Sequence, residues 1–453
     1  MTLVSKPNDS ITTQLNEVKG RVATVLELAK SLGADGAEVA MSRQQGLSVG
    51  TRMGEVENVE FTNDGALGIT VYRDGRKGSA STADLSEKAL AKTVTAAVNI
   101  ASYTSVDTCS GLADKNLLAM QPLDLDLYHP HDITTEQAIE LSKECEESAL
   151  TTDSRISNSD GASFDTFSGF KVYGNSHGQL VGYPSTRHSL SCVMIASENG
   201  QMERDYAYSV NRDFSLLNSA KSIGVEASEQ VLSRLNPRTL ATTKVPVLFK
   251  ADIANSIWGH LIAAISGGNL YRKSSFLLDA IGDSIFPKFL TINERPHIAK
   301  ALASSAFDSE GVLTQDREII SQGVLQTYLL TSYSARKLGL TTTGHAGGIH
   351  NWLVNASGHD GSFDAMLKTL GTGLLVTELM GQGVNVVNGD YSRGAAGFWV
   401  ENGIIAYPVS EITIAGNLKN MFEGIVAVGS DVDLRGSIRT GSVLIDEMQV
   451  AGR

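Results

Sequence analysis

The dipeptide Asn402-Gly403 constrains the fold of this chain more than any other short stretch, because apolar segments flank it on both sides. These segments are residues 398–400 and 404–407. Asn-Gly between two apolar segments is a strong signal for a β-hairpin, since both residues tolerate positive φ. Asp74-Gly75 and Asn199-Gly200 separate alternating segments in the same way. We therefore expect antiparallel sheets in several parts of the chain.

The first hundred or so residues predict a helix, a meander and a second helix. Residues 12–32 carry apolar side chains at steps of three and four, and Gly33 follows where a C-terminal cap belongs. The second helix is expected to begin at Asp84, with Glu87 as its capping-box partner. Strands are expected at residues 37–42, 47–52, 56–62, 67–73 and 76–81, with turns at Asn63-Asp64-Gly65 and Asp74-Gly75. These elements make a first α+β unit over residues 1–103.

A linker is expected over residues 104–132, where the sequence becomes polar and contains proline. His129, His131 and Asp132 lie close together in it and could ligate a metal. Pro130 stiffens this backbone and no fourth ligand is suggested, so a rigid, solvated linker is the favoured interpretation.

Residues 133–238 predict a middle domain, an antiparallel sheet with flanking helices. Thr134 and Gln137 form a capping box for one helix, which buries Cys145 as a core residue, and the other helix is expected over residues 214–235. The strands are expected at residues 163–173, 180–186, 190–196 and 202–210. A Gly-rich, β-dominated C-terminal domain is expected over residues 239–453. The predicted fold class is therefore α+β.

The composition predicts a soluble, cytoplasmic protein. With 37 basic and 50 acidic residues the net charge is −13, and no Lys/Arg cluster is present, so nucleic acid is not an expected partner. Cys109, Cys145 and Cys192 lie too far apart for a disulfide framework. No segment resembles a signal peptide or a membrane span, so no membrane association is expected. No glycine motif indicates a nucleotide cofactor.

Residues 389–397 combine polar side chains and one aromatic ring with very small neighbours. The small residues allow another backbone to approach closely, which suits an extended peptide in a groove lined by Asp390, Tyr391, Ser392 and Arg393. The alternative is a tight surface loop in which Asp390 and Arg393 pair with each other.

The segment GDYSRGAAGFWVENG, followed by YPVSEITIAGNLKNM, resembles the signature of the PmbA/TldE branch of the TldD/PmbA peptidase family. Residues 308–311, 323–329 and 343–345 resemble further blocks of this family, and the similarity covers essentially the whole chain. The resemblance implies a cytoplasmic metallopeptidase system made of two related subunits.

Residues 253–265 predict a helix that resembles the zinc-binding helix of the family's active subunit, with ligands at positions 255 and 260 and a general base at 256. Positions five apart point about 140° apart on an ideal helix, so a π-bulge would be needed to bring them together. This chain has Asn255, Ser256 and His260 there, which leaves His260 as a remnant metal position. The family's late cysteine ligand is also missing, since no cysteine follows Cys192. We expect no catalytic residue and no cofactor in this chain, and the resemblance implies zinc in the partner subunit.

His345, His350 and His359, with Asp360 beside the last, are a second candidate for a metal site. The glycines around them leave their geometry open. The alternative is a flexible surface loop with scattered imidazoles.

Three functional interpretations result. In the first, a PmbA/TldE-type subunit provides a cleft wall and a dimer surface while a TldD-type partner holds zinc, and the complex processes unfolded peptides. In the second, the chain is a homodimeric peptide-binding or regulatory protein without proteolytic activity. In the third, it is an autonomous metallopeptidase that uses the cluster from His345 to Asp360. The first is favoured because the residues of the zinc motif are replaced.

Overall fold

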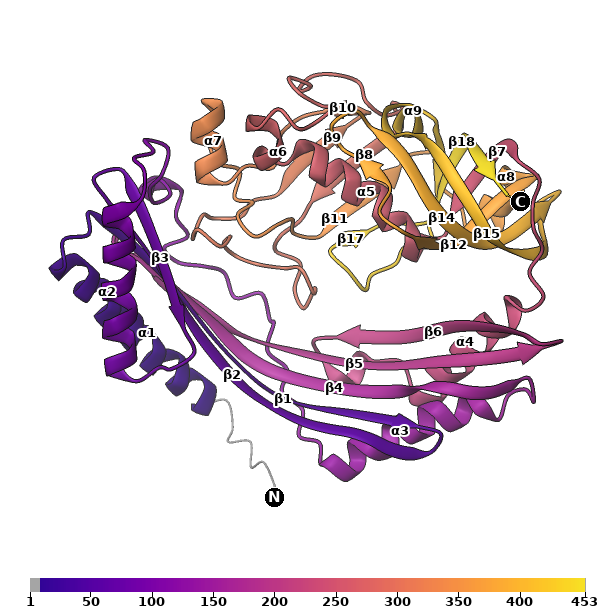
Figure 1. Cartoon of the computed structure of the whole chain (residues 1–453), viewed down its shortest axis with the longest axis horizontal. Helices are drawn as coiled ribbons and strands as arrows, with labels where there is room; N and C mark the ends of the chain where they lie inside the picture. Colours follow the sequence, from indigo (N-terminus) through magenta and orange to yellow (C-terminus); the bar gives the residue numbers. More distant parts are fainter. Residues whose placement is uncertain (1–8, 453) are drawn as a thin grey trace.

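The computed structural model describes residues 9–452, which form a long curved sheet and a compact C-terminal part facing it (Figure 1). The α+β fold class is confirmed. The N-terminal helix and meander, the middle antiparallel sheet with its helices and the β-dominated C-terminal part are all present. No helix within these residues is both long and apolar enough to cross a membrane.

The strands of the N-terminal and middle parts belong to one six-stranded sheet. The elements of these parts are α1 (Asp9–Ser31), β1 (Gly36–Arg52), β2 (Glu55–Arg73), β3 (Arg76–Thr82), α2 (Glu87–Tyr103), the 3-10 turn Lys115–Leu117, α3 (Thr135–Leu150), β4 (Ile156–Asn175), β5 (Leu180–Glu198), β6 (Gln201–Asn211), the 3-10 turn Phe214–Leu216 and α4 (Ala220–Ser233). The strand order is β3-β2-β1-β4-β5-β6, and every neighbouring pair is antiparallel. The two predicted units therefore share a sheet, with β1 and β4 in contact.

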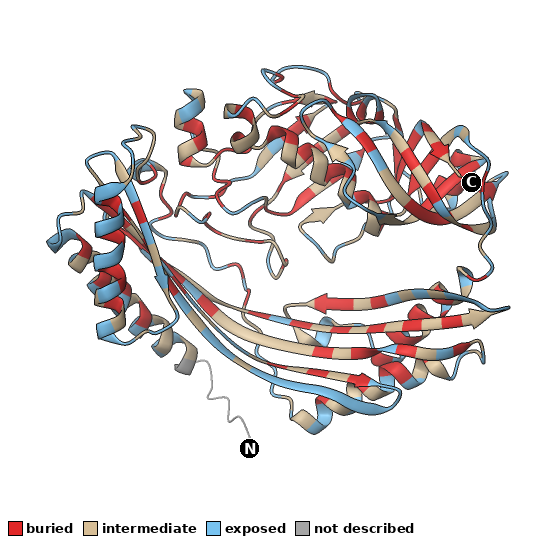
Figure 2. Ribbon diagram, viewed as in Figure 1, coloured by how far each residue is buried: buried red, intermediate tan, exposed pale blue. Residues whose placement is uncertain are grey.

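All four long helices cover the same face of this sheet (Figure 1). α1 and α2 pack on one end, around Val39 and Phe170, while α3 and α4 pack on the other, around Val49 and Phe164. Buried and more open residues alternate along the strands, because successive side chains point to opposite faces (Figure 2). The face without helices is concave and turns toward the C-terminal part.

The predicted turns of this sheet are partly confirmed. Asp74-Gly75 and Asn199-Gly200 form hairpin turns with positive φ at all four residues. The turn predicted at Asn63-Asp64-Gly65 is wrong, because these residues lie within β2 and pair with residues 43–45 of β1, and the chain turns at Met53-Gly54 instead. Continuous pairing along β1 outweighs the turn propensity of the three residues.

Two helices begin later than predicted. α2 starts after Ser86, whose hydroxyl accepts a hydrogen bond from the backbone nitrogen of Ala89, while Asp84 forms a turn before it. The helix predicted over residues 214–235 is interrupted, since α4 starts only after its N-cap Ser219. In both cases a serine hydroxyl provides the cap. The capping box predicted for α3 is confirmed.

The C-terminal part contains two sheets around one core. Its elements are β7 (Thr243–Phe249), α5 (Ala251–Ile265), α6 (Gly267–Tyr271), β8 (Leu290–Glu294), β9 (Arg317–Ser321), β10 (Val324–Leu325), α7 (Ser332–Leu338), β11 (Trp352–Ala356), α8 (Phe363–Leu370), β12 (Gly373–Met380), β13 (Val384–Asn385), β14 (Asp390–Glu401), β15 (Ile404–Asn417), α9 (Leu418–Glu423), β16 (Ile425–Val428), β17 (Ile438–Arg439) and β18 (Val443–Ala451). One sheet has the order β10-β9-β8-β11-β17. The other has the order β12-β7-β18-β15-β14-β13, and β12 pairs back to β14.

The central elements of this part match the sequence signals. The predicted hairpin at Asn402-Gly403 joins β14 to β15, with positive φ at both residues. Helix α5 contributes to the core shared by both sheets. Its Trp258 is fully buried and donates from the indole nitrogen to the Thr440 hydroxyl at 3.0 Å.

Residues 104–132 run between the two parts of the molecule, so the prediction of a solvated linker is wrong. Leu118 and Ala119 are buried, and the Ala119 nitrogen donates to the Gly311 carbonyl at 2.9 Å. Gln179, which is 1% exposed, donates to the carbonyls of Ala119 and Gly311 at 2.9 and 2.8 Å. One side chain of the turn between β4 and β5 therefore holds both the segment 104–132 and the C-terminal part.

We expect Gln179→Leu to weaken this contact, because it leaves the buried Ala119 carbonyl without a donor and the buried Asn175 amide without its acceptor. Each unsatisfied group costs about 1–3 kcal/mol, so the free energy of unfolding in urea should fall by about 2–5 kcal/mol. Gln45→Leu, at an exposed position of β1, is the matched control and should change stability by about 0.5 kcal/mol or less. Equal effects of the two substitutions would contradict the role given to Gln179.

Candidate functional site

Helix α5 carries the residues of the predicted remnant metal position. It is α-helical throughout, so Asn255 and His260 lie on different sides. Asn255 is exposed, and the Ser256 hydroxyl donates to a backbone carbonyl one turn earlier at 2.8 Å. The His260 ring packs edge-on against the ring of Tyr391, with centroids 5.7 Å apart. The structure therefore does not bring these three positions together.

Burial controls the charge of His260 and Tyr391. Burial, together with the positive charge of Arg393, lowers the pKa of His260 to about 4. Burial raises the pKa of Tyr391 to about 12, against the effect of Arg393. Both groups are neutral near pH 7, and neither His260 Nε2 nor the Tyr391 hydroxyl has a hydrogen-bond partner among the described residues. Residues 9–452 contain no group of three or more His, Cys, Asp or Glu that could hold a metal ion.

Residues 389–397 are not the loop that the sequence predicted. From Asp390 onward they belong to β14, which pairs with β12 and β13 on one side and β15 on the other. Tyr391 is 2% exposed, whereas Asp390 and Ser392 are exposed and Arg393 is half-buried. Asp390 and Arg393 do not pair: Arg393 Nε donates to a backbone carbonyl at 3.0 Å, and Asp390 accepts from two asparagine side chains.

Close backbone approach in this segment occurs at Gly397 rather than at Gly394. A side chain at Gly397 would collide with the carbonyl oxygen of Leu375 on β12. A side chain at Gly394 would meet the side chain of Met380 at 3.3 Å, which is tight but adjustable. Neither glycine has positive φ. The pairing of β14 with β12 is therefore what requires a glycine at position 397.

Two of the late histidines meet at a buried carboxylate. His345 Nε2 lies 2.8 Å from one oxygen of Glu294, and the backbone nitrogen of His350 donates to the other at 2.7 Å. The side chains of His345 and Glu294 are 2% and 3% exposed, so a substrate cannot reach them. His359 lies elsewhere and stacks on Phe289 with centroids 4.0 Å apart. A flexible surface loop is thus the wrong description of His345 and His350, and the three histidines do not form one site.

Sequence reasoning missed two buried carboxylates. Burial alone would raise the pKa of Glu294, but hydrogen bonds with His345 and His350 and their charges lower it to about 2. Burial raises the pKa of Asp308 to about 6, although this carboxylate accepts hydrogen bonds from three backbone nitrogens. The family-like block 308–311 was a signal for Asp308, whereas nothing in the sequence indicates that Glu294 lies beside His345.

The histidines of the segment 104–132 serve packing and surface contacts. His129 Nε2 lies 3.1 Å from the Asp126 carboxylate. The His131 ring stacks on Phe214 with centroids 3.8 Å apart, and Asp132 is exposed. These contacts place His129, His131 and Asp132 apart from one another in their roles: an ion pair, a ring stack and an exposed carboxylate.

Three family models match consecutive parts of the chain. They describe PmbA/TldA metallopeptidase domain 1 at residues 37–101, the central domain at residues 128–235 and the C-terminal domain at residues 242–452. The chain thus has the three domains of a class of metallopeptidases. The chain belongs to the PmbA/TldD metallopeptidase family, as the resemblance of its motifs predicted.

Known relatives cover the chain from end to end. It is 58% identical to Metalloprotease PmbA of Escherichia coli O157:H7 over the full length of both chains. It is 55% identical to the Metalloprotease PmbA homolog of Haemophilus influenzae, with 97% of each chain covered. A Metalloprotease TldD homolog of Buchnera aphidicola is 23% identical over 55% of this chain and 56% of its own length.

Solved structures share the fold. A Bacteroides thetaiotaomicron crystal structure, described as a candidate modulator of DNA gyrase, has a TM-score of 0.91 and 29% identity over 96% of this chain and 99% of its own. TldE from Thermococcus kodakarensis has a TM-score of 0.80 over 95% of this chain and 100% of its own, and its 18% identity makes it evidence for the fold alone.

We expect Glu294→Gln to destabilise the protein in a pH-dependent way. The folded pKa of about 2 lies below the ordinary value of 4.5, so the contribution of Glu294 is complete above about pH 4.5 and is lost as the pH falls toward 2. Breaking a buried ion pair costs about 3–5 kcal/mol, which urea unfolding at pH 7 should show. The difference from the unsubstituted protein should narrow below pH 4.5.

Glu318→Gln, at an exposed position of the neighbouring strand β9, is the matched control and should have little effect at any pH. A loss of stability in Glu294→Gln that does not change with pH would contradict an ionised role for Glu294.

Proposed function

We propose that this chain is one subunit of a two-component cytoplasmic metallopeptidase that processes unfolded peptides. It provides a wall of the cleft and a docking surface, while a TldD-type partner holds the zinc. The observation that carries the proposal is the arrangement of α5, where Asn255 and Ser256 replace a ligand and a base and His260 faces Tyr391. An amide is a poor zinc ligand, and a serine hydroxyl cannot take a proton from zinc-bound water.

An uncovered strand edge supports a docking role. Among residues 9–452, β1 is the only strand that pairs with residues 55–66 of β2, because β3 begins to pair at Leu67. Val56, Val59 and Phe61 are exposed along this edge. Unpaired backbone groups beside exposed apolar side chains favour pairing with another chain. The family includes proteins named TldD and TldE, which supports a related subunit as that chain.

The same edge could receive a second copy of this chain. It therefore also supports the alternative function, that of a homodimeric peptide-binding or regulatory protein without proteolytic activity. The two functions differ in what a zinc-bearing partner adds, since only the first requires cleavage by the mixed complex.

We expect the purified chain to contain little zinc and to cleave peptides poorly by itself. Adding a zinc-bearing TldD-type partner should give faster cleavage of unfolded peptides than the partner alone, because the cleft would then have both walls. Metal analysis and peptide cleavage assays on each chain and on the mixture measure this. Stoichiometric zinc in this chain that disappears in His260→Ala would refute the first part. Equal rates for the partner and the mixture would refute the second and favour the alternative.

The proposed peptide contact centres on Arg393. Its Nε donates to a backbone carbonyl and no carboxylate among the described residues pairs with it, so its positive charge is available to a peptide carboxylate. Tyr391 lies on the same side of β14 and supports it from the core, whereas Asp390 and Ser392 point to the opposite side. A single peptide would therefore contact either Arg393 on one side of β14 or Asp390 and Ser392 on the other side, but not all three residues.

We expect Arg393→Ala to raise the KM of the mixed complex about tenfold, because a charge-assisted hydrogen bond contributes about 1.5 kcal/mol or more. The value of kcat, the melting temperature and subunit assembly should stay unchanged. Arg21→Ala, on the exposed side of α1, is the matched control and should not affect KM. Steady-state kinetics decide the question, and an unchanged KM would assign Arg393 a purely structural role.

A further inference from the structure

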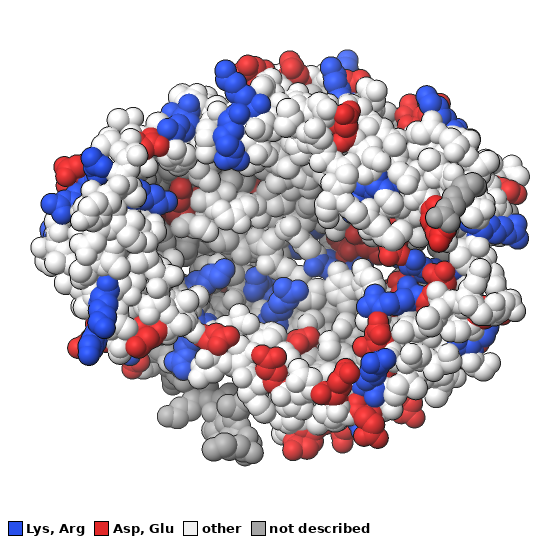
Figure 3. Space-filling model, in the orientation of Figure 1, with Lys and Arg blue, Asp and Glu red and all other residues white. Residues whose placement is uncertain are grey.

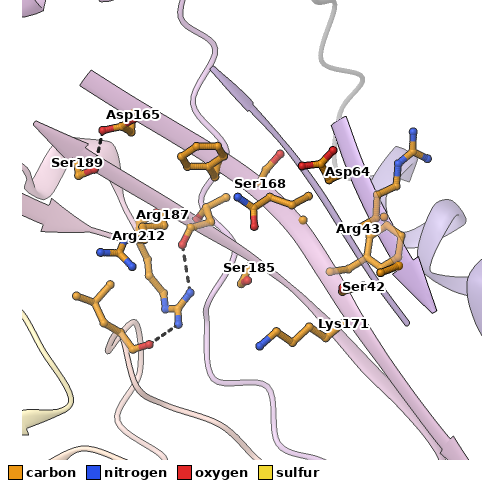
Figure 4. A pocket seen from close by; sticks show the side chains of 18 residues that line it. Ser42, Arg43, Asp64, Asp165, Ser168, Lys171, Ser185, Arg187, Ser189 and Arg212 are labelled. Carbon is orange, nitrogen blue, oxygen red and sulfur yellow. Dashed lines mark hydrogen bonds between the residues drawn. The ribbon is translucent and has the colours of Figure 1, made fainter. Parts of the chain in front are cut away.

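The concave face of the long sheet contains a cavity of about 650 Å³ that the peptidase motifs do not explain. Strands β1, β2, β4 and β5 form its floor, and Leu302 from the C-terminal part lines it from the other side. Figure 3 shows a hollow in this region of the molecule, in which Lys and Arg side chains gather. Figure 4 shows the residues that line the cavity.

The strand register identifies the side chains that point into the cavity. Lys171 on β4 pairs with Ser42 and Tyr183, and Arg187 on β5 pairs with Phe167. These positions alternate with the residues that pack under the helices, so Lys171 and Arg187 both belong to the concave face. Arg43 also borders the cavity, but it pairs with a residue of the helix-covered face and points away from Lys171 (Figure 4).

The cations of the cavity lack acidic partners. Lys171 and Arg187 are exposed and form no ion pair with any carboxylate of the described residues. Arg212 is fixed by the backbone carbonyls of Ala301, Leu302 and Thr186, at 3.0, 2.8 and 3.1 Å. Carbonyl groups orient this guanidinium without neutralising it. Burial lowers the pKa of Arg212, the charge of Tyr183 opposes this effect, and the charge of Arg187 lowers the pKa further.

This arrangement is unusual in a chain with 50 acidic and 37 basic residues. Cations placed near each other on an acidic protein would be expected to attract carboxylates of the same chain. Here they meet no carboxylate within ion-pair distance and border a cavity open to a ligand instead. Low-dielectric walls strengthen the field of such unpaired charges.

We propose that the concave cavity binds an acidic segment of a peptide through Lys171, Arg187 and Arg212. Lys171 and Arg187 stand two pleats apart on the same face, which corresponds to about 13 Å along a strand. Carboxylates four residues apart on an extended peptide have the same spacing. Ser42, Ser185 and Ser189 line the cavity between and beside the cations and can hydrogen-bond the peptide backbone.

The cavity favours sparse carboxylates over a nucleic acid. Asp64 and Asp165 also line it, so a backbone with a phosphate on every residue would meet negative charge. A peptide with two separated acidic residues brings fewer negative charges near these aspartates than a nucleic acid does. This inference rests on the proposed function only in so far as the ligand is a peptide, because the cavity itself requires no zinc and no partner.

The test measures peptide binding to the full chain alone. A fluorescent extended peptide with two glutamates four residues apart is compared by anisotropy with the matched glutamine peptide. We expect the acidic peptide to bind roughly five- to thirtyfold more tightly, which corresponds to two ion pairs of about 0.5–1 kcal/mol each. This preference should disappear in Lys171→Gln/Arg187→Gln and should shrink with added salt.

The matched control is Lys88→Gln/Lys92→Gln, which removes two exposed charges from α2 on the helix-covered side. It lowers the net charge equally and should keep the preference for the acidic peptide. Equal binding of both peptides, no binding of either, or the same loss in both double variants would overturn the proposal. A thermal melt of each variant verifies folding.

A single-stranded oligothymidylate is the second probe. If it binds more tightly than the acidic peptide and loses that affinity in Lys171→Gln/Arg187→Gln, the cavity is a nucleic-acid site and the peptide proposal is wrong. Failure of cleavage in the mixed complex would refute the two-component peptidase but leave the anisotropy result intact. Cleavage without a preference for acidic peptides would refute only the role of the cavity.

Discussion

The pairing of β1 with β2 on one side and β4 on the other is the interaction on which the rest of the structure depends. It joins the N-terminal and middle parts into one sheet, so all four long helices must bury their apolar sides against the same face. Twist along such long strands curves the sheet, and the uncovered face becomes a trough. The contact of Gln179 with Gly311 then holds the C-terminal part over that trough. The cavity is a consequence of this pairing.

Much of this architecture could be predicted from local signals, and the exceptions share one cause. Asn-Gly and Asp-Gly turns, apolar periodicity and the capping box of α3 report on neighbouring residues, and they located the corresponding elements correctly. Asn63-Asp64-Gly65 carries an equally good turn signal, yet these residues are strand because β1 offers them partners along its whole length. Whether such residues form a turn or a strand depends on pairing with residues distant in the sequence. This pairing could not be predicted from one sequence.

The candidate site follows the same rule. The small residues of β14 were recognisable, but only the position of β12 shows that Gly397 and not Gly394 must lack a side chain. His345 and His350 were recognisable as candidates, but their partner Glu294 comes from β8, about fifty residues earlier in the chain. The family motif located α5, whereas the packing of His260 against Tyr391 of β14 depends on the tertiary fold. Residue types are thus readable from the sequence, and the pairs that give them a role are not.

Net charge and local charge lead to different conclusions for this protein. A net charge of −13 argues against binding polyanions when the charge is spread evenly. The strand register instead places Lys171 and Arg187 on one concave face, while helices cover the opposite face. No cluster is visible along the sequence, because the cations are separated by 16 residues and meet only through the β4–β5 pairing. An acidic surface that surrounds a basic cavity disfavours long polyanions at a distance and still accepts a short segment with few charges. Such a field selects ligands by the spacing of their carboxylates as well as by their total charge.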